Sequence, residues 1–559
     1  MHMTQPVEEL VFAPLGGLGE IGMNAALYGF GPRKNRQWIL VDLGVSFAQA
    51  DTTPGIDLVY PDLQFLHSIR NNLLGLVVTH AHEDHIGAIA QLWPQVSVPV
   101  YGTRFSLGLL EARRLSEFNA PKIPLREVKQ GGVLTLGPFS IEFVPVSHSI
   151  PEANALCIRT PAGTVLHTGD WKLDATPVVG RATDVERLKA IGDEGVLALV
   201  CDSTNVVRAG SSPSEADVSH TLKDLIAGAS NRVCVTAFAS NVARIRSVAE
   251  AAAACGREVV VVGRGMDRVI QVADECGYLS GLPPFRAPDA LARLPRNKVV
   301  ALLTGSQGEP RAAMSRIARD DHPALKISPG DRVIFSSRTI PGNERAVGEI
   351  INRLMLKDVE VLTDRDHLVH VSGHPRRGEL EQLYGWIRPK IAIPAHGEPL
   401  HLTEHAAFAR AQGVPTVIRA LNGDVVAIAE GGAGVVGKIP SGVQYKDGDI
   451  VVPATEPAIA ERRRLSFAGV VSVAIAVDDG GNVIGEAEVQ IAGVPAKSPQ
   501  GEELAGLIGE IVDETIDNFP PRKRRDSGAF ASAVERAVRN ELRNIWGKKP
   551  ICHVMIVGV

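Results

Sequence analysis

The sequence predicts a multidomain α/β protein in which a second α/β domain interrupts the first. Short apolar, β-branched runs that end in polar clusters fill two separate blocks, one over about residues 10–205 and one from about residue 365. Between these blocks, amphipathic helical patterns alternate with short strands. The chain has 559 residues, too many for one hydrophobic core.

The two outer blocks predict a layered unit that builds a site along one edge. Strands are expected at 38–42, 75–79, 139–146, 164–168 and 196–201, and again from 367 and from 390. Such strands place polar residues at the edge of an α/β sandwich. The residues that follow them here are Asp42, His80, His148, Asp170, Asp202, His370 and His396.

The middle block predicts a doubly wound domain with a parallel sheet. Helical patterns at 214–227 and 242–255 alternate with strands at 232–238, 258–262, 298–303 and 332–335. In such a sheet ligands bind at the carboxyl ends of the strands, where Gly- and Ser-rich turns that lead into helices favour phosphate. Pro310 is expected in a first helical turn, although an ordinary strand-to-helix turn would look the same. The candidate phosphate contacts are Ser240, Asn241, Arg264, Gly305, Ser306, Gly308 and Arg338.

A small α+β domain is expected to close the chain. Strands at 470–477, 483–491 and 551–557 alternate with helices at 501–517 and 530–547. Basic runs at 462–464 and 522–525 are more often a solvated face than a binding site. The expected domain bounds are 1–208 and 365–445 for the interrupted domain, 209–364 for the inserted one, 446–460 for a linker and 461–559 for the last domain.

Composition restricts the function classes. Hydrophobic residues make up 45% and charged residues 22%, as in soluble globular proteins, and the net charge of −5 gives no global signature of nucleic-acid binding. A local basic channel would still bind RNA. The six cysteines form no C-x-x-C pair, which fits a reducing cytoplasm and argues against a thiolate metal site. No signal peptide and no apolar run of about 18 residues is present, so no membrane span is expected.

The most specific motif is the H-x-H-x-D-H loop at residues 80–85, which follows the apolar run 73–78. Imidazole and carboxylate groups together suit zinc or manganese better than calcium or magnesium. His80 and His82 would point the same way along an extended chain, while Asp84 and His85 could face a second ion. A solvated polar loop is the alternative reading. Isolated histidines are not expected to be ligands: His2, His67, His220, His322 and His553.

Three further motifs complete a pattern that resembles the metallo-β-lactamase superfamily. His148, Asp170 and His396 each follow an expected strand beside a turn-forming residue. The resemblance implies an αββα sandwich with two divalent ions per subunit, zinc first and manganese or magnesium as alternatives. It implies these roles: His80, His82 and His148 on one ion, Asp84, His85 and His396 on the other, Asp170 between both, and Asp42 orienting the histidine loop.

The segments 199–205 and 372–375, with Asp202 and His374, resemble motifs of the β-CASP nucleases, which carry their inserted domain between them. The segments 14–24, 238–241, 305–310 and 370–374, together with the last domain, are similar to the bacterial ribonuclease J family. That resemblance implies a ribonuclease of RNA decay and of rRNA and mRNA maturation, with 5′-to-3′ exonuclease and endonuclease activity. Single-stranded RNA with a 5′ monophosphate would be preferred, and the last domain would take part in a homodimer or homotetramer.

His374 exceeds the number of ligands needed for two ions. We therefore expect it to act on the scissile phosphate, as a charge stabiliser or as the acid that protonates the leaving oxygen. The expected catalytic residues are Asp84, Asp202 and His374, and His370, Ser372 and Gly373 would reach with His374 towards the RNA.

Three alternatives remain open. A hydrolase of small thioesters or lactams would use the same scaffold, but it would not need the long insertion. A β-CASP nuclease could act on DNA, or could cut RNA only internally. A protein without metals could simply tether RNA, although every expected ligand position holds a competent residue.

Overall fold

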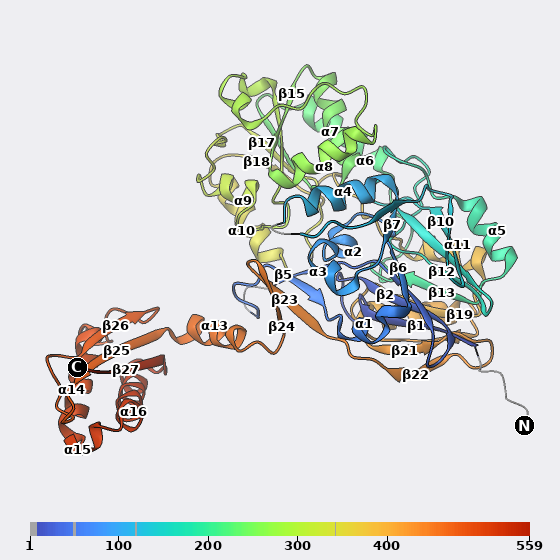
Figure 1. Ribbon diagram of the computed structural model, residues 1–559. Coiled ribbons are helices and arrows are strands. Elements are labelled where there is room, and N and C mark those ends of the chain that lie inside the picture. The colour runs from blue at the N-terminus through green and yellow to red at the C-terminus, as the bar shows by residue number, and fades with distance from the viewer. Residues whose placement is uncertain (1–7, 49–51, 118–119, 341) are drawn as a thin grey trace, which may run out of the picture. The chain divides into compact units, whose positions relative to one another are not determined.

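The computed structural model describes residues 8–48, 52–117, 120–340 and 342–559, which form two compact units (Figure 1). The larger unit contains the chain up to Ser46 and from Val59 to Val443. The smaller unit contains 47–58 and 444–559. The larger unit holds two packed sheets, whose strands come from two separate blocks of the sequence. A third, parallel sheet is formed by the residues between these blocks in the sequence, which confirms the predicted interrupted α/β fold.

The interrupted domain is built on two mixed sheets. The first has the order β22-β21-β1-β2-β3-β6-β7-β8 and the second β20-β19-β13-β12-β11-β10-β9. The first contains β1 (Glu8–Gly16), β2 (Ala25–Pro32), β3 (Gln37–Val41), β6 (Leu73–Val77), β7 (Val100–Gly102), β8 (Leu125–Glu127), β21 (Asp424–Ala427) and β22 (Gly434–Lys438). The second contains β9 (Val133–Leu136), β10 (Phe139–Pro145), β11 (Asn154–Thr160), β12 (Gly163–His167), β13 (Ala198–Asp202), β19 (Ile391–Ala395) and β20 (Thr416–Val417).

The two sheets bury a shared core, and helices cover their outer faces. Phe12 and Tyr28 of the first sheet pack in one cluster with Phe143 and Val200 of the second. Because β13 is buried on both faces, its sequence is continuously apolar up to Asp202. The outer helices are α5 (Val185–Glu194), α11 (Arg377–Ile387) and α12 (Pro399–Ala411) on the second sheet, and α1 (Gln64–Ile69), α3 (Ile89–Val96) and α4 (Arg104–Arg114) beside the first.

The inserted domain has a five-stranded sheet of order β15-β16-β14-β17-β18, parallel throughout as predicted. Its carboxyl edge carries the turns at 237–241, 263–264, 304–308 and 336–340. The elements are β14 (Val233–Thr236), β15 (Glu258–Val262), β16 (Val299–Leu303), β17 (Arg332–Phe335), β18 (Glu360–Leu362), α6 (Glu215–Ala227), α7 (Val242–Ala254), α8 (Arg264–Glu275), α9 (Ala313–Ala318) and α10 (Glu344–Met355). Figure 1 shows this domain in green and yellow above α4 of the larger unit.

Two local predictions for the larger unit are wrong. Pro310 is not in a helical turn, because α9 begins at Ala313 and the left-handed Gly305 and Gly308 keep the preceding chain out of helical geometry. Residues 367–370 form no strand. Their backbone is held by side chains instead, since the Val369 carbonyl accepts hydrogen bonds from Arg244 Nη1 at 2.8 Å and Ser336 Oγ at 2.7 Å.

The smaller unit contains an α+β domain. Its sheet has the order β26-β25-β27, and alternate residues of β25 pack against α14 and α16. Residues 446–460, expected to be a linker, hold the β23–β24 hairpin and the start of α13. The elements are β23 (Val443–Asp447), β24 (Ile450–Pro453), α13 (Pro457–Ala468), β25 (Val470–Val477), β26 (Glu488–Ala492), α14 (Leu504–Asn518), α15 (Pro521–Arg524), α16 (Ser527–Trp546) and β27 (Ile551–Gly558).

The two basic runs of this unit do not lie wholly on a solvated face. Arg524 is buried, and its Nε donates a hydrogen bond to the Phe519 carbonyl at 3.0 Å. Arg462 pairs with Asp447 at 2.6 Å. The boundaries of the segment 47–58, which belongs to the smaller unit, fall within two short strands, β4 (Ser46–Phe47) and β5 (Leu58–Pro61). Among the described residues, no helix is both long and apolar enough to cross a membrane.

Candidate metal centre

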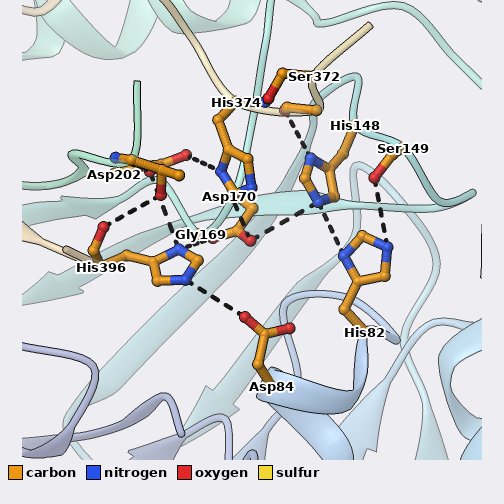
Figure 2. A network of polar contacts seen from close by, with 12 residues as sticks. His82, Asp84, His148, Ser149, Gly169, Asp170, Asp202, Ser372, His374 and His396 are labelled. Carbon is orange, nitrogen blue, oxygen red and sulfur yellow. Dashed lines mark hydrogen bonds and ion pairs between the residues drawn. The ribbon is translucent and has the colours of Figure 1, made fainter. Parts of the chain in front are cut away.

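The expected ligands meet at one edge of the two-sheet body. His80 and His82 lie in the turn after β6, and Asp84 and His85 lie in the short helix α2 (Glu83–Ile86) that follows. The remaining residues come from the turns after β10, β12 and β19. Figure 2 shows side chains from α2, from these turns and, for His374, from the irregular segment before α11 (Arg377–Ile387) converging: His82, Asp84, His148, Asp170, His374 and His396.

Ligand atoms of these residues form three overlapping groups, in each of which the atoms lie within 4.8 Å of one another. The groups are His80–His82–His148–Asp170, Asp84–His85–Asp170–His396 and Asp170–Asp202–His374–His396. The first two contain the residues expected around two ions, and Asp170 is present in all three. Side chains so arranged can hold two cations that share one carboxylate.

The hydrogen bonds around the first group leave bare imidazole nitrogens facing one another. His148 Nδ1 donates to the Gly373 carbonyl at 2.7 Å, so in the neutral ring its Nε2 carries a lone pair. Thr79 Oγ1 donates to Asp42 at 2.7 Å and so accepts from His80 Nδ1 at 3.0 Å, which leaves His80 Nε2 bare. Both lone pairs face His82 Nδ1, at 3.0 and 3.2 Å. One proton cannot satisfy this arrangement, whereas a cation at its centre would.

The second group has the same property. His396 Nδ1 donates to Asp170 Oδ1 at 2.7 Å, and its buried Nε2 has no hydrogen-bond partner while it faces Asp84 Oδ2 at 3.3 Å. His85 Nδ1 donates to Asp42 at 2.7 Å, which turns its Nε2 towards Asp170 Oδ2 at 3.3 Å. Each Nε2 faces a carboxylate across a gap where a positive charge, a proton or a metal ion, is stabilised, so these residues fit a second ion.

The electrostatics of the two groups differ. Burial lowers the pKa of His80 and His148 well below the usual value and lowers that of His82 to about 4, so these imidazoles are neutral, the form that binds metals. Burial acts in the same direction on His85 and His396, but nearby carboxylates, Asp170 first, outweigh it and raise the pKa of both rings. The second group therefore attracts positive charge strongly.

Asp42 lies behind the ligands rather than among them. Its carboxylate is buried and accepts hydrogen bonds from the Thr79 amide at 2.8 Å, from the Thr79 hydroxyl and from His85 Nδ1. The residue adopts a left-handed φ of 60°, as does His396 with a φ of 51°. Such conformations cost energy in non-glycine residues and persist where surrounding contacts require them. Here they direct His396 into the site and hold Asp42 behind His85.

His374 is held by a buried carboxylate. Its Nδ1 lies 2.8 Å from Asp202 Oδ2 and 4.0 Å from Asp170 Oδ2. The Asp202 side chain is fully buried, whereas 20% of the His374 side chain is exposed. Burial would lower the pKa of His374, but the carboxylates of Asp202 and Asp170 outweigh burial and raise it. The arrangement fixes Nδ1 as a donor to Asp202 and leaves Nε2 for a ligand.

Sequence reasoning missed two asparagines that position this centre. Asn24 Nδ2 lies 3.0 Å from His85 Nε2 and donates to the Asp84 carbonyl at 3.1 Å. Asn205 Nδ2 donates to Ser372 Oγ at 2.8 Å and to the His374 carbonyl at 3.1 Å. Both occur inside segments that carried the family resemblance, 14–24 and 199–205, which was the available signal.

Gly373 supports a ligand directly. Its carbonyl holds His148, and a Cβ at this position would lie 2.5 Å from His148 Cε1. Gly373 was expected to contact RNA; the structure shows in addition that its carbonyl positions His148. Ser372 Oγ, in turn, is held by Asn205 and accepts from the His374 amide at 3.3 Å.

The candidate phosphate contacts lie at the carboxyl edge of the inserted sheet, but several also have structural tasks. The Asn241 side chain caps α7 by accepting from the Arg244 amide at 2.9 Å. Ser306 is buried, and Ser240 is half-buried. Gly305 and Gly308 have φ angles of +106° and +80°, and a Cβ on Gly308 would lie 2.7 Å from the Cβ of Ala346 on α10. A bulky residue at Gly308 would therefore displace a helix.

Cations gather near the segment 370–374. Burial, followed by the guanidinium groups of Arg338 and Arg376, lowers the pKa of Arg208. Burial and the cations Arg244 and Arg338 lower the pKa of His370, whose buried Nδ1 has no hydrogen-bond partner. Arg338 also lies 3.6 Å from Asp364. Arg264 is exposed at the start of α8 and is not among the cations that shift the pKa of Arg208 or His370. The cluster is a local basic surface in a chain whose net charge is −5.

The histidines expected to be non-ligands take part in none of the three groups: His67, His220, His322 and His553. His2 lies outside the described residues.

The sequence matches protein-family models over most of its length. The matches are to the metallo-beta-lactamase superfamily at 24–185, the ribonuclease J beta-CASP domain at 230–354, a Zn-dependent metallo-hydrolase RNA specificity domain at 358–419 and the ribonuclease J C-terminal domain at 457–559.

Full-length relatives agree with these matches. Ribonuclease J of Sinorhizobium meliloti is 50% identical over 558 residues, covering 100% of this chain and 99% of the relative. Ribonuclease J of Mycobacterium tuberculosis is 40% identical, covering 98% and 96%. A crystal structure of a protein of unknown function from Enterococcus faecalis V583 matches with a TM-score of 0.53 at 18% identity, over 75% of this chain and 100% of that one, which shows similarity of fold alone.

Proposed function

The chain belongs to the ribonuclease J family, and on this premise we propose that it is a ribonuclease that hydrolyses RNA phosphodiesters with the help of two divalent metal ions. The observation that supports this most strongly is the pair of His/Asp groups that share Asp170. Zinc is the proposed ion, since imidazole and carboxylate ligands suit it, with manganese and magnesium as alternatives. Elemental analysis of the purified protein should find about two ions per chain.

Metal ions bound in such groups would supply Lewis-acid chemistry, lowering the pKa of water and offsetting charge on phosphate oxygens. Asp170 orients His396, and Asp42 fixes His85 through its Nδ1. Thr79 and the Gly373 carbonyl orient His80 and His148. In His374, Asp202 holds the Nδ1 proton, so the ring can turn Nε2 towards a scissile phosphate. We propose that His374 either stabilises the phosphate charge or donates a proton from Nε2 to the leaving oxygen. Asp202 positions it.

We propose that the RNA runs from the carboxyl edge of the inserted sheet to the metal centre. Support comes from the basic surface around Arg208, Arg338 and Arg376, together with the unpartnered Nδ1 of His370. These cations would bind a 5′ monophosphate and so support 5′-to-3′ exonuclease activity. Endonuclease cleavage would follow when an internal stretch of an RNA, rather than its 5′ end, reaches the metal centre. A triphosphate brings more charge to desolvate, and a hydroxyl leaves the cations without their anion.

End-labelled RNA with a 5′ monophosphate, triphosphate or hydroxyl tests this proposal. We expect mononucleotide products and fastest decay for the monophosphate. Arg338→Ala should reduce that preference and spare internal cleavage. Arg286→Ala is the matched control, because Arg286 also pairs with a carboxylate, Glu258, but at the amino end of the same sheet. Equal decay of all three ends would refute the end preference, and absence of any cleavage with metals bound would refute the ribonuclease.

Two further points rest on family membership. We propose a homodimer or homotetramer in which the C-terminal domain takes part, which light scattering would test by mass. We also propose a cytoplasmic role in RNA decay and in rRNA and mRNA maturation, in keeping with six cysteines that form no disulfide.

A further inference from the structure

A cavity separate from the metal centre lies at the opposite end of the strands that lead to that centre. Its volume is about 300 Å³, and its lining comes from the start of β1, the β2–β3 turn, α1 and β22. β3 runs from this cavity to the metal centre, since Arg36 precedes the strand and Asp42 follows it. At about 3.3 Å per residue the two sites are roughly 20 Å apart.

The cavity is strongly basic. Its lining includes the cations Arg33, Lys34, Arg36 and Lys438 and a single carboxylate, Glu9. Arg36 pairs with Glu9, and Lys438 lies 3.3 Å from Asp424. Among the described residues, neither Arg33 nor Lys34 forms an ion pair. The cavity therefore has surplus positive charge that a ligand anion could neutralise.

One buried donor in the cavity lacks an acceptor. Arg36 is 8% exposed, and its Nε is buried without a hydrogen-bond partner, although its guanidinium group reaches Glu9. Unpaired buried donors are rare because they forfeit hydration without replacement. Glu9 therefore satisfies the Arg36 guanidinium only in part, at the wall of the cavity.

The rest of the wall fits a ligand larger than a bare anion. Trp38 and Phe65 form an edge-to-face pair with ring centroids 5.7 Å apart, and Trp38 is fixed over Gly29, where a Cβ would lie 2.6 Å from its ring. Ser68 and Asn72 add a hydroxyl and an amide. Small-ligand pockets combine such apolar walls with a few polar groups.

We propose that this cavity is an accessory site for a phosphate-bearing nucleotide, either a free nucleoside monophosphate or one nucleotide of an RNA chain. The phosphate would lie against Arg36 and the rim cations Arg33 and Lys34, with the base towards Phe65. The choice of a nucleotide among anions rests on the proposed function, whose exonuclease reaction would release nucleoside monophosphates. The site itself needs neither metals nor hydrolysis.

Calorimetry of the full chain with AMP, and separately with inorganic phosphate, tests the site. The His80→Ala background removes a metal ligand and leaves the cavity intact. We expect an AMP site in both backgrounds, beside any AMP bound at the metal centre or the basic surface near 370–374. Its affinity should fall at least tenfold after Arg33→Glu with Lys34→Glu, and after Ser68→Trp, which crowds the cavity. Arg522→Glu with Lys523→Glu is the matched control, because it makes the same charge change at exposed neighbours on another unit. Melting curves confirm that each variant folds.

Each outcome decides the proposal. AMP binding that disappears in His80→Ala and ignores the cavity variants would overturn it, and phosphate binding as tightly as AMP would overturn the nucleotide class. In the same background, anisotropy with RNA of increasing length separates the two ligand sources. If Arg33→Glu with Lys34→Glu weakens the binding of long RNAs but not of short ones, the cavity is an RNA subsite. If the same variant weakens AMP binding and leaves RNA affinity unchanged, the cavity is a site for free nucleotides. Because binding is measured without hydrolysis, an inactive enzyme would refute the proposed function and leave this test intact.

Discussion

Replacing His374 and Asp202 separately and together would show whether the histidine acts at the reaction and the aspartate acts through it. His374→Ala removes the acid or charge stabiliser, which should slow single-turnover RNA cleavage by ~10²–10⁴-fold. Asp202→Asn keeps the side-chain shape but removes the buried charge 2.8 Å from His374 Nδ1. A hydrogen bond to a charged group contributes about 1.5–3 kcal/mol, and 1.36 kcal/mol is tenfold in rate, so Asp202→Asn should cost roughly 10- to 150-fold.

The cleavage rate of the double variant shows whether Asp202 acts through His374. If Asp202 works by orienting His374, Asp202→Asn should cost nothing further once His374 is alanine, so the double variant should cleave no more slowly than His374→Ala. Metal content should stay at the wild-type level in all three proteins. Multiplicative losses would show that Asp202 acts independently, and loss of metal from His374→Ala would make that residue a ligand and refute the division of roles.

Three other perturbations test the surrounding structure. His80→Ala should lower metal content and abolish nearly all cleavage while the fold persists, and full activity with depleted metal would contradict the ligand assignment. Gly373→Ala should reduce metal affinity ~10–100-fold, measured by competition with a chelator, because its Cβ would meet the His148 ring at 2.5 Å. Burial lowers the pKa of His405 to about 4, so its neutral form contributes up to about 3 kcal/mol of stability above pH 6.5, lost as the pH falls towards 4. Between pH 7.5 and 5.5 the wild type should therefore lose about 1 kcal/mol more than His405→Gln, measured by denaturant unfolding, and equal losses would contradict the burial argument.

Much of the architecture could be predicted because it depends on local patterns. The strand 470–477 is β25 itself, since alternating burial leaves a period of two in the sequence. The H-x-H-x-D-H loop can be interpreted from sequence because four candidate ligand residues fall within six positions. The turns of the inserted domain were placed correctly at the carboxyl edge because parallel βαβ units bring those turns together.

The contacts that orient the ligands could not be predicted, because they join residues far apart in the chain. Nothing near Gly373 indicates that its carbonyl holds His148, which is 225 residues away. Asn24 lies 61 residues from His85, and its amide matters only once β2 and α2 are adjacent. The error at Pro310 has a different source, because Gly305 and Gly308 compete with proline's helical preference and their φ angles depend on the tertiary structure.

The irregular segment between β18 and α11 explains why the inserted domain and the metal centre cannot be understood separately. At one end, the Val369 carbonyl is held by Arg244 and Ser336 of the inserted domain. A few residues later, the Gly373 carbonyl fixes His148, and His374 reaches Asp202. A strand in this place would direct its backbone hydrogen bonds into a sheet, whereas an irregular chain leaves its carbonyls free to fix a metal ligand. The returning chain therefore joins the inserted domain to the candidate metal centre through backbone carbonyls at both of its ends.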